Sequence, residues 1–350
     1  MIIENVLGAF DAVFQLKNII LMSVGVAAGL VTGAIPGFTI TMAVVLTLPF
    51  TFGMSAVEGI STMIGVFVGG LSGGLMASVL TGIPGTPSSV ATTFDGYPMT
   101  RSGRPGLALG LGVWSSFFGG IISAIFLMLL APSLAKIGLE FGPWDYFTLV
   151  LFALTITASL AGENMVKGII AGGVGLLITA IGEDEISGVA RFTFGFEPLE
   201  QGFDFLPVLV GLFAFSQLLS DLRDKERAKQ PMLASATRIA IEHVQAIKQI
   251  IHHWKTLIRS SMIGIFVGIL PGAGGTIANI LAYDQAKKAS EHPEKFGTGV
   301  PEGIIAPESS NNAVEGGALI TMMALGIPGD IVTAVMLGAL MIHNIAPSPT

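Results

Sequence analysis

The sequence predicts an all-α, polytopic membrane protein in which two internal repeats contain helices broken by Pro-Gly pairs. Hydrophobic residues make up 51% of the 350 residues, charged residues only 12%, and the mean hydropathy is +0.76. A soluble domain carries about 25% charged residues, so this composition indicates a bilayer. Long apolar segments recur along the chain, and the same two breaks occur twice within them.

The breaks come in the same order in two parts of the chain. Gly33-Ala-Ile-Pro-Gly37 precedes Gly82-Ile-Pro-Gly85, and Gly268-Ile-Leu-Pro-Gly272 later precedes Gly326-Ile-Pro-Gly329, at nearly the same separation. This order indicates an internal duplication. In membrane proteins, broken helices at corresponding places in two repeats are typical of a transport site.

About 20 apolar residues are needed to cross roughly 30 Å of hydrocarbon. On this basis we expect spans near 18–36, 59–82, 106–131, 144–161, 165–182, 203–220, 257–281 and 315–343. The shorter stretch Phe38–Met54 contains Pro49 and fits either a thin span or a re-entrant half-helix. If it crosses, the two repeats are inverted, and if it only dips into the bilayer they are parallel; we favour the inverted arrangement.

A basic segment separates a first unit, residues 1–220, from a second unit, residues 262–350. This segment, residues 221–261, holds eight of the 17 basic residues, so the positive-inside rule places it in the cytoplasm, together with Arg101 and Arg104. Its apolar residues recur at helical spacing and predict an amphipathic helix that lies in the headgroup layer or packs on the protein. They are Ala240, Val244, Ile247, Ile251, Trp254 and Ile258.

The breaks are the places where chemistry is expected. Proline lacks an N–H and clashes with the carbonyl four residues back, so each helix must kink or stop there. Backbone groups freed at membrane depth are tolerated only where protein, water, ions or substrate satisfy them. A helix that restarts after a break offers N–H groups to a carboxylate or phosphate, while the carbonyls before the break suit a cation.

We therefore predict a substrate and ion site from the glycines and prolines of the breaks and the small polar residues beside them. At the first two breaks the candidates are Gly33, Pro36, Gly37, Thr39, Thr41, Pro84, Gly85, Thr86, Ser88, Ser89, Thr92 and Asp95. In the second repeat they are Pro271, Gly272, Gly274, Gly275, Thr276, Asn279, Ser309, Ser310, Asn311, Asn312, Pro328, Gly329 and Asp330.

Each signal has a structural alternative. Glycine and proline also serve close helix packing, and Thr86–Ser89 and Ser309–Asn312 fit helix N-caps. The acids nearest the breaks fit the membrane–water interface, where charge costs little. They are Asp95, Asp284, Glu308 and Asp330. The alternative function is a membrane-embedded enzyme acting on a lipid-linked anionic substrate, with Asp95 near Arg101 and Arg104 as its best candidate group. Cysteine is absent, and Gly272–Gly275 lacks the Lys-Ser/Thr ending of a nucleotide-binding loop. We expect no metal site, no nucleic-acid partner and no cofactor other than a coupling ion.

Three long segments resemble the large membrane subunit of tripartite tricarboxylate transporters, the TctA family. They are Gly29-Leu-Val-Thr-Gly-Ala-Ile-Pro-Gly37, the run from Ile83 through Thr86-Pro-Ser-Ser89 and Asp95-Gly-Tyr-Pro-Met-Thr-Arg-Ser-Gly103, and Pro301-Glu-Gly-Ile-Ile-Ala-Pro-Glu-Ser-Ser-Asn-Asn-Ala-Val-Glu-Gly-Gly317. The resemblance extends from the first span to Gly338-Ala-Leu-Met-Ile-His343 and is strongest at the segments selected above on physical grounds.

The resemblance implies a bacterial inner-membrane secondary transporter that takes up citrate or another carboxylate with a sodium or proton gradient. It also implies two partners, a periplasmic solute-binding protein and a small transmembrane subunit. Family chains usually run further, whereas this one stops at Pro347-Ser-Pro-Thr350, so we expect a truncated second unit. The quoted motifs do not distinguish one carboxylate from another.

Overall fold

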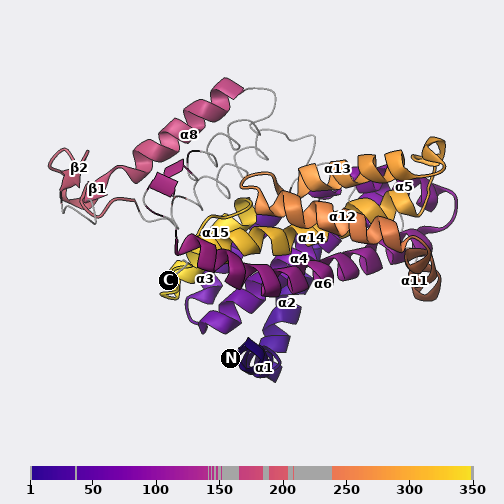
Figure 1. Cartoon of the computed structure of the whole chain (residues 1–350), viewed down its shortest axis with the longest axis horizontal. Coiled ribbons are helices and arrows are strands. Elements are labelled where there is room, and N and C mark those ends of the chain that lie inside the picture. Colours follow the sequence, from indigo (N-terminus) through magenta and orange to yellow (C-terminus); the bar gives the residue numbers. More distant parts are fainter. Residues whose placement is uncertain are drawn as a thin grey trace. The chain divides into compact units, whose positions relative to one another are not determined.

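The computed structural model describes residues 2–35, 38–140, 165–183, 189–203 and 239–347, with a few single positions between 142 and 208. The chain divides into two compact units, one of residues 1–140 and 224–350 and the other of residues 141–223. The all-α prediction is confirmed, because the described residues are overwhelmingly helical (Figure 1). Within the described residues, three helices are long and apolar enough to cross a membrane: α2, α4 and α6.

The first part of the larger unit contains seven elements. In chain order they are α1 (Ile2–Val13), α2 (Leu16–Ala34), α3 (Ile40–Thr51), α4 (Ala56–Thr81), the short 3-10 helix η1 (Pro87–Ser89), α5 (Val90–Arg101) and α6 (Pro105–Gly138). Its second part contains α11 (His243–His252), α12 (Trp254–Ile269), α13 (Gly274–Ala289), the 3-10 helix η5 (Pro293–Lys295), α14 (Glu302–Leu325) and α15 (Ile331–Ile342).

Helices α2 and α4 pack closely along matching rows of glycine. A Cβ on Gly25 would lie 2.4 Å from the carbonyl oxygen of Thr62, and one on Gly33 would lie 2.0 Å from that of Gly70. Glycines on α4 face α2 in the same way, since a Cβ on Gly69 would lie 2.3 Å from the oxygen of Val26. Small residues at this spacing let two backbones approach closely, which is how helices associate in lipid.

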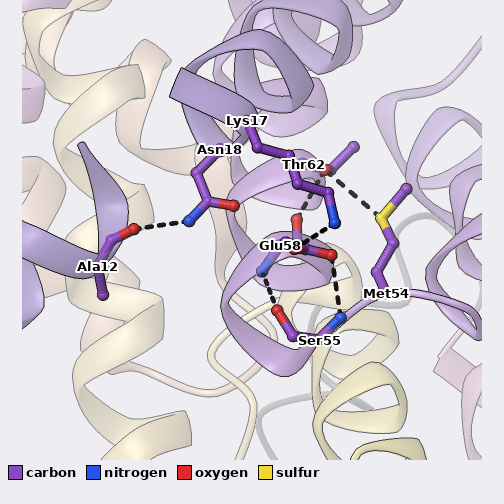
Figure 2. A network of polar contacts seen from close by, with 7 residues as sticks. All are labelled: Ala12, Lys17, Asn18, Met54, Ser55, Glu58 and Thr62. Carbon is purple, nitrogen blue, oxygen red and sulfur yellow. Dashed lines mark hydrogen bonds and ion pairs between the residues drawn. The ribbon is translucent and has the colours of Figure 1, made fainter. Parts of the chain in front are cut away.

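Both of these helices begin at the same end of the unit, so they run parallel. Figure 2 shows the contacts there: Lys17 of α2 forms a 2.7 Å ion pair with Glu58 of α4, and Glu58 also accepts from the backbone N–H of Ser55. Ser55 accepts in turn from the N–H of Glu58, which completes a capping box at the start of α4. Asn18 fixes the end of α1 by donating to the carbonyl oxygen of Ala12.

Helix α3, which lies between α2 and α4 in the chain, runs in the opposite direction to both. Ile40, at its start, packs on Gly70 in the middle of α4, whereas Thr51, at its end, packs on Gly59 near the beginning of α4. Because α2 and α4 run the same way, the segment that joins them has to return across the unit. Helix α3 has 12 residues and is one of the shorter apolar helices of the described chain, so the crossing alternative for Phe38–Met54 stays a prediction.

The same path recurs in α12, α13 and α14. A Cβ on Gly264 would lie 2.2 Å from the oxygen of Ser310, and one on Gly268 would lie 2.4 Å from that of Val314, so α12 runs parallel to α14. Helix α13 runs back, because Gly275 at its start faces Asn311 whereas its last turns pack near Ala306. At the common start of α12 and α14, His253 lies 3.2 Å from Glu302.

Helix α4 runs antiparallel to α6 and α14. Its first turns line an apolar cavity of about 200 Å³ with Leu127 of α6 and with Leu319 and Met322 near the end of α14. Its later turns, at Leu75, join a core cluster with the first turns of α6 and α14. The two glycine-rich helices α4 and α14 therefore point in opposite directions. Each ends at a left-handed glycine, Gly82 with φ 72° and Gly326 with φ 69°.

Two of the predicted spans are wrong as single helices. Segment 257–281 consists of the end of α12 and the start of α13, which turns back at Pro271-Gly272, and segment 315–343 consists of the end of α14 and α15. The apolar sequence continues through each break, so hydropathy does not show it. Pro271 and the left-handed Gly272 stop the first helix, and the left-handed Gly326 stops the second. Predicted spans 144–161 and 203–220 lie almost wholly outside the described residues.

The predicted amphipathic helix is also divided. It ends at His252, and α12 starts afresh at Trp254. Val244, Ile251 and Trp254 are exposed, while a second apolar stripe, Ala246, Ile250 and Leu257, faces the core. The start of α6 adjoins α11, because the N–H of Glu242 donates to the carbonyl oxygen of Gly106. Residues 221–238, with most of the basic side chains, lie outside the described residues.

In the smaller unit the described residues form α8 (Met165–Thr179), a short antiparallel pair of strands, β1 (Gly182–Glu183) and β2 (Ala190–Arg191), and the 3-10 helix η2 (Glu197–Leu199).

Candidate substrate site

The segments that follow the second break (Pro84-Gly85) and the third break (Pro271-Gly272) contact each other and the middle of α14. A Cβ placed on Gly275, in the first turn of α13, would lie 2.6 Å from Oδ1 of Asn311 and 3.0 Å from Cβ of Ser88. Ser88 belongs to η1, directly after Pro84-Gly85, and it is buried together with Thr86 and Ser89. The site therefore combines one element from each predicted repeat with the central helix of the second.

The N-terminus of α13 differs from those of the other helices that restart at breaks. Thr39 accepts from the N–H of Met42 and caps α3, and Asp330 accepts from the N–H of Thr333 and caps α15. Helix α5 receives its acceptor from the other half of the unit, because the N–H of Ala91 donates to Oδ1 of Asn279 at 2.8 Å. Among the described residues, no side chain accepts from the first N–H groups of α13, whose N-cap is an alanine. Free N–H groups and the positive end of the helix dipole together favour an anion.

Asn311 faces this uncapped end with an unused amide. The side chain is only 1% exposed, and among the described residues neither its Oδ1 nor its Nδ2 has a hydrogen-bond partner. A buried polar group costs free energy when it is unpaired, so this amide calls for a partner such as water, an ion or a ligand. The neighbouring hydroxyls of Ser88 and Thr86 lie 3.2 Å apart and complete the polar wall.

A chain of hydrogen bonds leads from the site to a buried carboxylate. Asn279 of α13 donates to Oγ1 of Thr92 of α5 at 3.4 Å, and Thr92 donates to Oε1 of Glu308 of α14 at 2.5 Å. Ser116 of α6 donates to Oε2 of Glu308 at 3.1 Å. All four side chains are buried. The network joins four helices one turn away from Asn311.

Asp95 belongs to a different arrangement, in which its carboxylate holds a loop. Backbone N–H groups of Gly297, Gly299 and Val300 donate to it at 2.7–3.0 Å, and the hydroxyl of Tyr283 donates to Oδ2 at 2.8 Å. The carboxylate is fully buried, so its oxygens are occupied by protein donors. This geometry gives Asp95 a positioning role between α5 and the loop before α14.

The first and fourth breaks adjoin the same region by backbone contacts. The N–H of Gly272 donates to the carbonyl oxygen of Gly329 at 2.8 Å. A Cβ on Gly85 would lie 2.4 Å from the oxygen of Gly33, and one on Gly329 would lie 2.3 Å from that of Gly268. Pro36 and Gly37 lie outside the described residues.

The remaining predicted residues surround this centre at different depths. Gly272 and Thr276 are exposed, and those that are partly buried are Thr41, Pro84, Pro271, Gly274, Pro328 and Asp330. The alternative that Ser309–Asn312 form an N-cap is wrong, since α14 begins at Glu302 and runs through them. Ser310 and Asn312 bond to backbone carbonyls of Ala278 and Glu308. Ser89 does act as a local cap, because its Oγ accepts from the N–H of Thr86.

Sequence reasoning did not assign Glu308, Ser116 or Tyr283 to the site. Glu308 carries a usable signal, a carboxylate in the middle of a helix of small and apolar residues, which is costly in a membrane without a function. Ser116 and Tyr283 carry none, because only the packing of α6 and α13 brings them to their acidic partners.

Antiparallel glycine-packed helices, with breaks that converge on an uncapped helix N-terminus, define a polytopic membrane protein of the transporter class. The chain belongs to the tripartite tricarboxylate transporter TctA family, whose model matches residues 19–350. It is thus a membrane transporter component of tricarboxylate transport. The predicted family is confirmed.

Two relatives from Agrobacterium vitis support this assignment. An uncharacterized 52.8 kDa protein in the TAR-I ttuC' 3' region is 33% identical over 358 residues, which cover 99% of this chain and 68% of the relative. An uncharacterized protein in the TAR-II ttuC' 3' region is 40% identical over 86 residues, 25% of this chain and 36% of the relative. No solved structure matches.

Proposed function

We propose that this chain is the permease subunit of a secondary transporter that imports citrate or a related carboxylate, driven by a sodium or proton gradient. In this proposal a periplasmic solute-binding protein delivers the substrate and a small transmembrane subunit completes the complex in a bacterial inner membrane. Family membership supports the transporter, and the geometry of the site supports an anionic substrate.

One observation carries the anionic substrate: the uncapped N-terminus of α13 faces the unpartnered amide of Asn311 and the hydroxyl of Ser88. A substrate carboxylate at this point would accept from the first N–H groups of α13 and from Nδ2 of Asn311. Helix N-termini serve anions in this way in broken-helix transporters. The coupling ion would use the carbonyls and hydroxyls freed at the same breaks.

We also propose that the two halves of the larger unit are inverted repeats. Corresponding contacts support the repeat, since Lys17–Glu58 at the start of α2 and α4 matches His253–Glu302 at the start of α12 and α14. The packing of Gly85 on α2 matches that of Gly329 on α12. The antiparallel directions of α4 and α14 support inversion. Alternating access would then move one repeat relative to the other around the site.

The enzyme alternative has less support from the same geometry. Its best candidate acid, Asp95, has its oxygens occupied by four protein donors and holds a loop in place. A general acid or base needs an oxygen within reach of a substrate proton.

The test is uptake of labelled citrate and a panel of other carboxylates by cells that express the chain with its two partners, with and without each ion gradient. Gly275→Ala places a methyl group between Asn311 and Ser88, so we expect it to abolish uptake. Gly120→Ala is the matched control, because nothing lies within 4 Å of a Cβ at that helical position.

Uptake that depends on the binding protein and on a gradient, and that is lost in Gly275→Ala but kept in Gly120→Ala, supports the proposal. Equal uptake by both variants in correctly inserted protein would remove the site from this position. Absence of uptake for every carboxylate, with the complex assembled, would contradict the function itself.

A further inference from the structure

Glu308 is a buried carboxylate whose two oxygens each accept from one side-chain hydroxyl. It lies in the second turn of α14 and is 0% exposed. Oε1 accepts from Thr92 at 2.5 Å and Oε2 accepts from Ser116 at 3.1 Å. Three helices, α5, α6 and α14, therefore meet at this one group.

The direction of the hydrogen bond is fixed at Oε1. The N–H of Ala91 donates to Oδ1 of Asn279, which turns the amide so that its Nδ2 donates to Oγ1 of Thr92. Among the described residues, the only acceptor within reach of the Thr92 hydroxyl proton is Oε1 of Glu308, so the proton points there. Oε1 is thus an acceptor whether or not the carboxyl group is protonated.

The bond at Oε2 can run in either direction. Ser116 makes no other hydrogen bond among the described residues, and a hydroxyl can either donate or accept. It donates to a carboxylate Oε2 and accepts from a protonated one. The pocket therefore accommodates both states of Glu308 with only a rotation of the Ser116 hydroxyl.

Within the described part of the chain, no cation compensates this carboxylate. The helices that pack on α14 carry other titratable or charged side chains, but none of them bonds to Glu308. They are Glu58 on α4, Asp95, Tyr97 and Arg101 on α5, Lys136 on α6, Lys255 and Arg259 on α12, Tyr283, Asp284, Lys287 and Lys288 on α13, Asp330 at the start of α15, and Glu302 and Glu315 on α14 itself. An isolated charge at this depth is costly, and binding a proton removes it.

We propose that Glu308 is the proton-carrying group of the transport cycle, with the proton on Oε2 directed at Ser116. Loading forms the Oε2–H bond with a proton taken from water, and release breaks that bond and returns the proton to water. Thr92 and Asn279 link this event to α13, whose N-terminus forms the substrate site. The inference rests on the proposed function, which leaves the choice between sodium and proton open.

The test is infrared spectroscopy of the reconstituted chain titrated with acid, following the carbonyl band of protonated carboxyl groups. We expect a pH-dependent component that is absent in Glu308→Gln. Ser116→Ala keeps the carboxyl group but removes the partner of Oε2, so the same component should remain and titrate at a different pH. Glu315→Gln is the matched control, a second buried acid on the same helix, and it should leave the Glu308 component in place.

The measurement needs no substrate, so its outcome is independent of whether the carboxylate uptake test succeeds. A spectrum in which Glu308→Gln removes no titrating component would overturn the proposal. So would a component that sodium removes at constant pH, because Glu308 would then bind the metal cation. In the complex, Glu308→Gln should lose accumulation driven by a pH gradient, and undiminished accumulation would also refute the proton-carrying role.

Discussion

Two pairs of helices that restart at breaks follow the same backbone path but differ in chemistry. Seven residues after the break glycines, α5 and α13 carry Thr92 and Asn279, both 0% exposed, whereas α15 and α3 carry Met336 and Val44, which are just as buried. The first pair exchanges hydrogen bonds with α14, and the second pair packs around apolar side chains. We call them the polar side (α5 and α13) and the apolar side (α3 and α15).

This difference indicates that the two sides of the unit have different roles. On the apolar side, each helix N-terminus is capped by its own Thr39 or Asp330 and needs no ligand. On the polar side, Asn279 of α13 accepts from the first turn of α5, and α13 itself is uncapped among the described residues. Position 275 gives the same contrast, since glycine there lets Asn311 and Ser88 approach closely, whereas the position three residues after Gly37 is Ile40, which packs on Gly70. The candidate site lies on the polar side, where the N-terminus of α13 and the amide of Asn311 have no side-chain partner among the described residues.

The largest expected effect comes from removing the acid of the polar side. Asp95→Ala leaves three backbone N–H groups and the Tyr283 hydroxyl without their acceptor, at a cost of about 3–5 kcal/mol in the free energy of unfolding. Asp95 lies ten residues after Gly85, and the corresponding position of the apolar side, ten residues after Gly329, is Ala339. The measurement is denaturant unfolding in detergent. A stability equal to wild type would mean that the loop 297–300 does not depend on Asp95.

The second prediction exchanges chemistry without changing shape. Thr92→Val keeps the volume but leaves Oε1 of Glu308 and Nδ2 of Asn279 without a partner, which costs about 1–3 kcal/mol and should strongly reduce uptake. Met336→Leu, at the corresponding position of the apolar side, should cost less than about 1.5 kcal/mol and preserve uptake. Thermal unfolding and transport are measured on both variants. Similar losses of uptake would remove the functional distinction between the two sides.

The third prediction concerns the packing that holds the polar face of α14 in place. A Cβ on Gly119 of α6 would lie 2.3 Å from the carbonyl oxygen of Ser309, and backbone at this distance cannot yield easily. Gly119→Ala should therefore destabilise the protein by about 1–3 kcal/mol. The adjacent Gly120→Ala should be neutral or slightly stabilising, because a helix favours alanine over glycine. Equal unfolding temperatures for the two variants would contradict the close approach of α6 and α14.

The helix ends at the Pro-Gly breaks could be predicted from the sequence, because the backbone properties of proline and glycine determine them. Proline and glycine at 271–272 and 328–329 specify that a helix stops, and the order of the breaks specifies a repeat to look for. Hydropathy could not show that α13 turns back beside α14, because an apolar run has the same composition whichever way it runs. Glu308 and Ser116 are far apart in the chain, so their contact depends on packing alone. The N-cap interpretation of Ser309–Asn312 failed because local polarity does not distinguish a helix start from a buried polar face.

The smallest predicted effect compares the two ion pairs at the helix starts. Burial lowers the pKa of His253 below its usual range, Glu302 partly opposes this and His252 adds to it. Since the folded state disfavours the charged ring, the contribution of His253 to stability is complete above about pH 6.5 and is lost as the pH falls through its lowered pKa. The matching contact joins Lys17 and Glu58 and contains no histidine. His253→Gln should therefore flatten the acid-side decline of the unfolding temperature, whereas Lys17→Gln should lower that temperature by a small amount and leave the slope near that of the wild type. If both variants kept the wild-type slope, His253 would not be the group that senses acid at the start of α12.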